Sequence, residues 1–125
     1  MDRTYEAWIP GELPSRNESE LAARANKFAG ASLKHKATRK VELCCLGCRQ
    51  TGWVPMERYH VTVHYLCKSK RKDPDNVCGA IKFVMDGLVA AGVVAGDRWR
   101  NVLSLTQTWE CNTNKPGVYL KVTGD

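Results

Sequence analysis

The chain has 125 residues, and its 19 Lys and Arg against 13 Asp and Glu give a formal net charge of +6. This length predicts a single domain over residues 1–125 and excludes two domains of ordinary size. The chain begins without the basic and apolar segments of a secretory signal, and no run approaches the roughly 18 apolar residues of a membrane-spanning helix. We therefore expect a cytoplasmic protein with no membrane partner, whose charge favours a polyanion such as nucleic acid.

The first half of the chain predicts one strand and two helices. Residues 4–10 fit a strand that ends at a turn rich in Gly and Pro. Residues 17–28 fit a helix with Asn17 or Ser19 as its N-cap. A second helix is expected to follow Gly30. Its apolar stripe recurs every three or four residues, at Leu33, Ala37, Val41, Cys44 and Cys48.

The region between residues 21 and 41 contains cations but no acid. Its cations are Arg24, Lys27, Lys34, Lys36, Arg39 and Lys40. On a helix they form a basic exposed face, which predicts contact with a DNA backbone, and the last four are our candidate contact residues. A solvated surface is the alternative interpretation.

The second half of the chain predicts three strands and one helix. Residues 58–67 alternate between apolar and polar side chains, as a half-buried strand does. Residues 76–91 fit an amphipathic helix that ends at Gly92. Residues 100–109 and 117–123 fit two strands joined by a polar loop, long enough for a hairpin. This order of elements predicts an α+β domain in which helices cover a mixed sheet.

Acidic residues are scarce between Arg58 and Trp109, where the chain has only Asp73, Asp75, Asp86 and Asp97. In an extended loop, Asp73 and Asp75 project to the same side. If the chain returns Asp97 to them, the three carboxylates form a site for Mg²⁺, or for Mn²⁺, because these ions prefer oxygen ligands. Such an ion supports phosphodiester hydrolysis. Candidate phosphate ligands precede the loop at Lys68, Lys70, Arg71 and Lys72.

The same residues also have a purely structural interpretation. "DPDN" fits an ordinary helix start in which Asp75 or Asn76 caps free backbone N–H groups. Asp86 lies four residues after Lys82 and fits a surface ion pair. These interpretations leave a non-catalytic nucleic-acid-binding module as the alternative class of function.

The chain has six cysteines, and without an export signal they are expected to be free thiols or metal ligands rather than disulfides. Cys45 and Cys48 have the spacing of half a zinc site, with Cys44 adjacent. The sequence has no second cysteine pair of this spacing to complete the site, since Cys67, Cys78 and Cys111 stand apart from one another. Because Cys44 and Cys48 also belong to the helical stripe, we interpret them as buried thiols. A binding module stabilised by zinc through Cys45 and Cys48 is the alternative.

The string "KRKDPDN" followed by "IKFVMDGLVAAGVVAGDRWRNV" resembles the RusA-like Holliday junction resolvases, which are phage and prophage endonucleases. Residues 70–102 carry the resemblance, with a fainter similarity in "LPSRNE". It implies that Asp73, Asp75 and Asp97 bind the catalytic Mg²⁺. Lys82 would neutralise charge on the phosphate in the transition state. It also implies a RusA-like homodimer, in a bacterial or phage-infected cell, that resolves four-way branched DNA by paired nicks.

Two positions depart from the family pattern. Many relatives place the lysine four residues after the second aspartate, where this chain has Gly79. Lys82 is matched instead by its spacing to Asp86 and Asp97. Gly96 stands where many relatives have a second acid, so a catalytically weakened prophage resolvase is a further alternative.

An Arg-Trp-Arg sequence follows the last aspartate. Trp99, between Arg98 and Arg100, could stack on DNA or serve as an anchor in the core or at a dimer interface. No apolar seam in the sequence identifies that interface.

Overall fold

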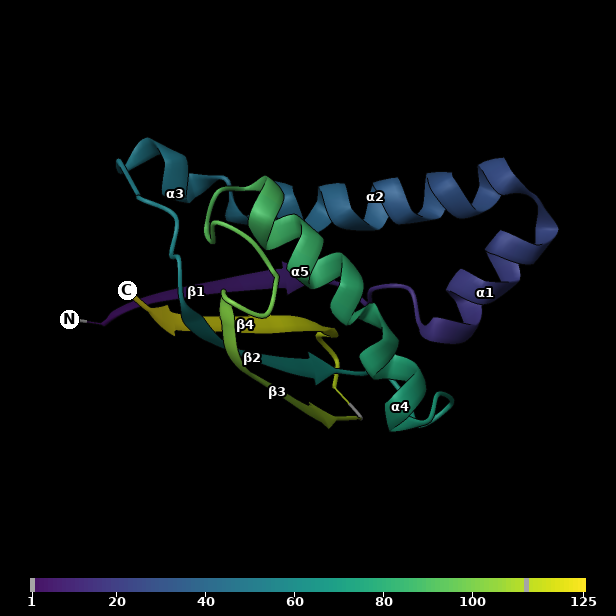
Figure 1. Cartoon of the computed structure of the whole chain (residues 1–125). Coiled ribbons are helices and arrows are strands. Elements are labelled where there is room, and N and C mark those ends of the chain that lie inside the picture. The colour runs from purple at the N-terminus through teal and green to yellow at the C-terminus, as the bar shows by residue number, and fades with distance from the viewer. Residues whose placement is uncertain (1, 112) are drawn as a thin grey trace.

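The computed structural model describes residues 2–111 and 113–125. Within these ranges, four strands form one mixed sheet in the order β1-β4-β2-β3. They are β1 (Arg3–Pro10), β2 (Tyr59–Leu66), β3 (Val102–Glu110) and β4 (Gly117–Gly124). Figure 1 shows that the helices gather on one face of this sheet.

The helices are α1 (Arg16–Ala25), α2 (Lys27–Cys45), α3 (Gly47–Gln50), α4 (Pro74–Val77) and α5 (Ile81–Ala90), with a 3₁₀ turn at Cys78–Ala80 before α5. α2 and α5 lie over the sheet and pack against each other (Figure 1). This arrangement confirms the prediction of an α+β domain with helices on a mixed sheet. No helix in the described part of the chain is both long enough and apolar enough to cross a membrane.

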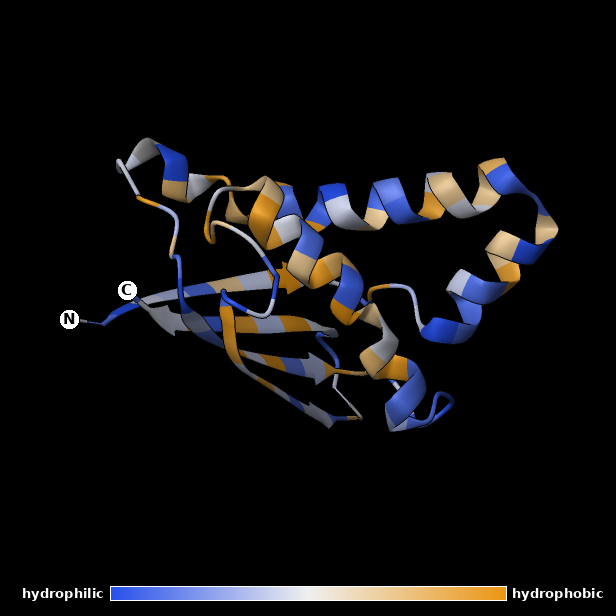
Figure 2. Cartoon of the chain, viewed as in Figure 1, coloured by the Kyte–Doolittle hydropathy of each residue, from blue (hydrophilic) through white to orange (hydrophobic). Residues whose placement is uncertain are grey.

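Alternating burial along β2 gives the sheet its inner face. Every second residue is buried, at Tyr59, Val61, Val63 and Tyr65, while the residues between them are exposed or half-buried. Figure 2 shows the same alternation of hydrophobic and hydrophilic residues along the strands. Because successive side chains of a strand point to opposite faces, the buried set packs beneath the helices. The predicted strand at residues 58–67 is confirmed.

The predicted hairpin between residues 100–109 and 117–123 is wrong. β2 lies between β3 and β4, parallel to β3 and antiparallel to β4. The buried side chains of β2 favour a central position, whereas β3 is mostly exposed and occupies the edge. The loop after β3 therefore passes the end of β2, where Cys67 N–H donates to the Glu110 carbonyl at 2.8 Å.

The first helix begins earlier than predicted, because its N-cap is Ser15 rather than Asn17 or Ser19. Ser15 has an extended backbone, and its hydroxyl accepts a hydrogen bond from Glu18 N–H. The Glu18 carboxylate accepts in return from Ser15 N–H at 3.1 Å. This reciprocal capping box fixes the start of α1.

A single residue, Asn26, separates α1 from α2. Its backbone is extended, and its side-chain oxygen accepts from Ala29 N–H at 2.7 Å, so it caps α2. The helix predicted to follow Gly30 therefore already begins at Lys27. A Cβ on Gly30 would lie 3.0 Å from Ala23 Cα, so this glycine lets the two helices approach closely.

The contact between α2 and α5 closes the core. The apolar stripe predicted for α2 is confirmed at Ala37 and Val41 but is wrong at Cys44, which is exposed. Cys45, four residues after Val41, takes the buried position instead. On α5, a Cβ added to Gly87 would overlap the side chain of Val41. The absence of a side chain at Gly87 thus sets how closely the two helices pack.

We expect Gly87→Ala to destabilise the protein by about 1–3 kcal/mol, because overpacking a core contact costs roughly that much. Val41 is fully buried and has little room to withdraw. The matched control is Gly47→Ala in α3, where a Cβ meets nothing within 4 Å; it should change stability by less than about 1 kcal/mol. Urea denaturation measures both variants. Equal stability of the two would contradict this packing.

Candidate functional site

The acidic loop begins after β2 and leads into α4. Asp73 occupies the N-cap position with an extended backbone (φ −67°, ψ 153°), and Pro74 opens the helix. Asp75 lies in the first helical turn, so the predicted extended conformation of "DPD" is wrong. The helix start is confirmed, although the predicted caps Asp75 and Asn76 lie inside it and the Asp73 side chain makes no capping bond. The Asp73 and Asp75 side chains are exposed, which leaves their oxygens accessible to a ligand.

Two contacts hold the acidic loop against α1. Asn76 Oδ1 accepts from the backbone N–H of Asn17 at 2.8 Å. Lys72 Nζ donates to Glu18 Oε1 at 2.5 Å. The hydrogen bond from Lys72 lowers the pKa of Glu18. The aspartates therefore lie between two anchor points, Lys72 before them and Asn76 after them.

Asp97 stands before β3, at the start of a turn that Asn101 holds in place. Asn101 is 3% exposed, and its Oδ1 accepts from Arg98 N–H at 3.2 Å while its Nδ2 donates to the Glu57 carbonyl at 2.8 Å. A Cβ on Gly96 would lie 2.7 Å from Asn101 Oδ1. An acid at position 96 would therefore displace Asn101, which gives a structural reason for the glycine there.

One chain does not bring Asp97 to Asp73 and Asp75. The Tyr59 hydroxyl, at the start of β2, donates to the Gly96 carbonyl at 2.8 Å, and burial together with the charge of Asp97 raises the pKa of Tyr59. Asp73 follows the opposite end of β2, and a strand of this length spans roughly 23 Å at about 3.3 Å per residue. In the described ranges, no three His, Cys, Asp or Glu side chains lie close enough to hold a metal ion.

Asp97 opens onto a groove between α5 and the start of β3, which it shares with Lys82. Lys82 Nζ lies 3.2 Å from Asp86 Oδ1, which confirms the predicted ion pair. The same groove has a largely apolar lining that includes Ile81, Met85, Trp99, Val102 and Leu105. One carboxylate and one lysine of the predicted site thus line the same groove at this end of the sheet.

Asp73 lines a separate hollow at the other end of the sheet. Its neighbours there include Lys70 and Lys72 from the basic loop, with Trp109 and Glu110 from the end of β3. Cations beside an exposed carboxylate suit a phosphate group, whose charge the carboxylate alone would repel. The predicted site residues therefore form two half-sites at opposite ends of β3.

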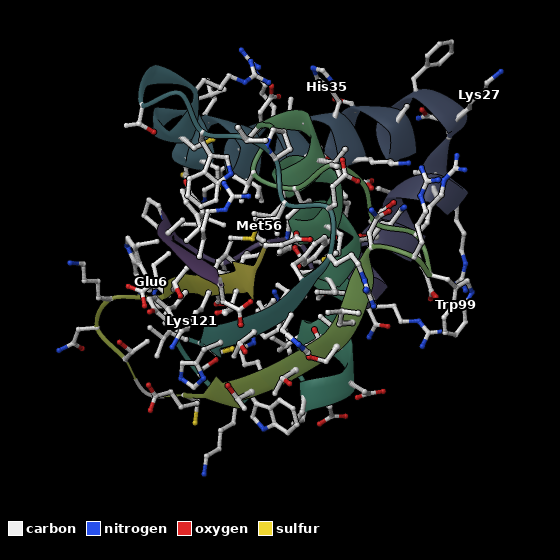
Figure 3. The ribbon with its side chains drawn as sticks, turned by 60° about the vertical axis from the view of Figure 1, so that its left-hand side comes forward. Glu6, Lys27, His35, Met56, Trp99 and Lys121 are labelled. Carbon is white, nitrogen blue, oxygen red and sulfur yellow. The ribbon has the colours of Figure 1, made fainter. Side chains whose placement is uncertain are left out.

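The edge strand β3 carries apolar residues that no described element covers. Leu103, Leu105 and Trp109 are 45%, 44% and 50% exposed. In the turn before the strand, Trp99 is 99% exposed, so its interpretation as a core anchor is wrong, and Figure 3 shows it at the periphery of the molecule. Sequence reasoning missed this apolar edge because a strand's own pattern does not show which neighbours cover it. Such an edge marks a surface for association.

The predicted DNA contacts form two accessible groups on separate elements. On α2, Lys34, Lys36 and Arg39 are exposed and Lys40 is half-buried. In the loop after β2, Lys68, Lys70 and Arg71 are exposed and Lys72 is half-buried. The exposed members of both groups can therefore reach a ligand outside the domain, whereas the ammonium of Lys72 is bonded to Glu18.

The C-x-x-C cysteines belong to the core. Cys45 and Cys48 are buried, and the Cys48 thiol donates to the Ala91 carbonyl at 3.4 Å. Burial raises the pKa of Cys45 to about 11, and in the described ranges these thiols belong to no group of three His, Cys, Asp or Glu side chains that could hold a metal ion. All six cysteines carry free thiols. The structure thus favours the interpretation of Cys45 and Cys48 as core thiols.

Neither the protein-family models nor the curated proteins match this sequence. The exposed carboxylates of Asp73, Asp75 and Asp97 have the hard oxygen ligands that Mg²⁺ prefers. Their separation means that a site using all three needs a second chain.

We expect Glu18→Gln to weaken the link between α1 and the acidic loop in a pH-dependent manner. Because the pKa of Glu18 is lowered in the folded protein, its ionised form adds stability above the unfolded pKa of about 4.3, and this is lost as the pH falls through the folded value. The wild type should be more stable by less than about 1 kcal/mol at neutral pH. Urea denaturation at neutral and at acidic pH measures both free energies of unfolding, and the difference between wild type and Glu18→Gln should shrink at acidic pH.

Glu20→Gln is the matched control, because it removes a carboxylate that pairs within α1, with Arg16 at 3.2 Å. Hydrogen exchange at residues 70–76 should increase in Glu18→Gln and stay unchanged in Glu20→Gln. An equal effect of both substitutions on the loop would show that Glu18 does not anchor it.

Proposed function

We propose that this protein is a Mg²⁺-dependent endonuclease that nicks four-way branched DNA. The proposal depends on one observation above all: a basic protein exposes a few acids beside cations at both ends of one edge strand. Asp73 shares one hollow with Lys70 and Lys72, and Asp97 shares a groove with Lys82. The resemblance of residues 70–102 to RusA-like resolvases supports the same function.

The proposal requires a dimer, because each chain contributes two half-sites that do not meet. If two β3 edges pair antiparallel around a two-fold axis, the start of each strand lies beside the end of the other. Asp97 and Lys82 of one chain would then approach Asp73 and Asp75 of the partner subunit. Two equivalent sites would result, as paired nicks in a two-fold symmetric junction require.

The surface of β3 supports this interface. Its outer edge has unpaired backbone groups, and its large apolar side chains Leu103, Leu105 and Trp109 are exposed. The nearly fully exposed Trp99 extends the same apolar surface. Aromatic residues are enriched at the centres of protein interfaces, where their burial contributes most of the binding energy.

In the proposed hydrolysis, the Mg²⁺ ion and the side chains of the protein would have different roles. When bound, Mg²⁺ would activate the attacking water and stabilise the leaving oxygen. Lys82 would contact a non-bridging phosphate oxygen and offset the charge that grows there. Lys70 and Arg71 would hold neighbouring phosphates. Hydrolysis then joins the water oxygen to phosphorus and breaks one phosphorus–oxygen ester bond.

A non-catalytic junction-binding module is the second candidate function. The separation of the carboxylates within one chain favours it, and so does Gly96, which leaves Asp97 without an adjacent acid. A weakened resolvase would lie between the two, with tight binding and slow cutting. Zinc through Cys45 and Cys48 has little support as a stabiliser, because a structural site needs four ligands and, in the described ranges, no third His, Cys, Asp or Glu side chain joins them.

We expect symmetric nicks in a labelled four-way junction with Mg²⁺ and none in a linear duplex of the same sequence. EDTA and Asp75→Asn should each slow nicking by at least about 100-fold, because loss of one charge-stabilising group typically costs that much. Asp2→Asn removes an exposed acid outside the site and should cut at the wild-type rate. Tight junction binding without cutting by the wild type would favour the binding module.

We expect that Asp75→Asn and Asp97→Asn chains, each inactive alone, regain nicking when mixed and allowed to exchange subunits. A hybrid dimer has one intact site, made of Asp75 from one chain and Asp97 from the other. Random exchange would restore about a quarter of the wild-type sites. If each site lay within one chain, every site of the hybrid would carry a substitution and no activity would return.

A further inference from the structure

We infer that the outer face of α2 binds DNA and that Phe28 stacks on an unpaired base at the branch point. Neither the proposed metal site nor the basic loop uses this residue. The inference rests on the proposed function only in taking branched DNA as the ligand, and it does not depend on cleavage.

Phe28 is an exposed aromatic residue on a rigid element. It is the second residue of α2 and is 81% exposed. Its backbone is ordered by the cap at Asn26, which accepts from Ala29 N–H at 2.7 Å. Figure 1 shows that the corner between α1 and α2 projects away from the sheet. The ring is therefore presented outward without any loop that must first become ordered.

Phe28 continues a ridge along α2. Ser32, His35 and Arg39 follow it at spacings of four, three and four, so all four side chains share one face of the helix. All four are exposed. Figure 3 shows Lys27 and His35 pointing outward from this helix. The opposite face of α2 lies in the core, which leaves the ridge free for a ligand.

The charge around the ridge identifies the kind of ligand. The exposed cations nearby are Arg24, Lys27, Lys34, Lys36 and Arg39, and no acid occurs between residues 21 and 41. Only the two arginines pair with carboxylates, Arg24 with Glu20 at 3.9 Å and Arg39 with Glu42 at 3.0 Å, among the described contacts. A second copy of the same ridge would be repelled. A polyanion would be attracted, and an aromatic ring among cations suits nucleic acid.

The spacing of residues along α2 separates phosphate binding by the lysines from base stacking by Phe28. At 1.5 Å per residue, Lys34 and Lys40 lie roughly 9 and 18 Å along the helix from Phe28. This corresponds to about three to five base pairs at 3.4 Å each. The lysines can hold phosphates of either linear or branched DNA. A ring outside a continuous duplex meets no free base face, whereas a branch point can expose one, so Phe28 would distinguish the two forms.

The test is binding to a fluorescent four-way junction and to its linear duplex, both in EDTA so that no strand is cut. Phe28→Ala should weaken junction binding by about five-fold to a hundred-fold, the range measured for loss of one base–aromatic stack. Duplex binding should change by less than about two-fold, because the phosphate contacts remain. Phe28→Trp should keep the wild-type preference. Lys36→Ala should weaken both complexes equally.

Val54→Ala is the matched control, because Val54 is an exposed apolar residue, 66% exposed, in the connection before β2. It should bind both forms as the wild type does. The inference would be overturned if Phe28→Ala bound the junction as tightly as the wild type, or if it lost equal affinity for the junction and the duplex. It would also be overturned if the wild type bound no DNA. A protein that needs Phe28 for the junction but never nicks it would support the inference and reject the nuclease.

Discussion

The parallel pairing of β2 with β3 is the constraint on which the rest of this structure depends. Tyr59 pairs with Val102 at one end and Leu66 with Glu110 at the other. A parallel pair needs a crossover, so the chain that leaves the end of β2 must travel back through α4 and α5 to the start of β3. The acids on the two sides of that crossover consequently lie at opposite ends of the sheet. The same pairing leaves β3 at the edge, with its outer backbone groups free.

Two close contacts determine where the crossover lies. Gly87 lets α5 approach Val41 of α2, and the buried Asn101 joins the turn after Asp97 to the segment before β2, through Arg98 N–H and the Glu57 carbonyl. Because both contacts are tight, Lys82 and Asp97 have defined positions beside one groove. Precise placement of this kind is what a site shared between two chains would need, since neither chain can adjust the other's half.

The cations and the candidate metal-binding aspartates lie on a small number of elements. Cations occur on the outer face of α2 and in the loop after β2, where Asp73 and Asp75 follow them directly, whereas Asp97 stands before β3. The anchors between Lys72 and Glu18 and between Asn76 and Asn17 join the acidic loop to α1, which leads directly into α2. Base stacking would thus belong to α2, hydrolysis to the segments at the two ends of β3, and phosphate binding to both α2 and the loop after β2. Shape selectivity for branched DNA would follow from the spacing of those elements.

The sequence by itself determined the features that depend on local periodicity and local chemistry. Alternation predicted β2, the expected end of the helix near Gly92 agrees with the end of α5 at Ala90 and with the positive φ of 79° at Gly92, and the spacing of Lys82 and Asp86 predicted their ion pair. Only the tertiary structure decided that β2 separates β3 from β4, that Asn101 fills the space beside Gly96, and that Asp97 lies far from Asp73. A periodic pattern reports which face of an element is buried, whereas strand neighbours and site geometry result from competition among contacts distant in the chain.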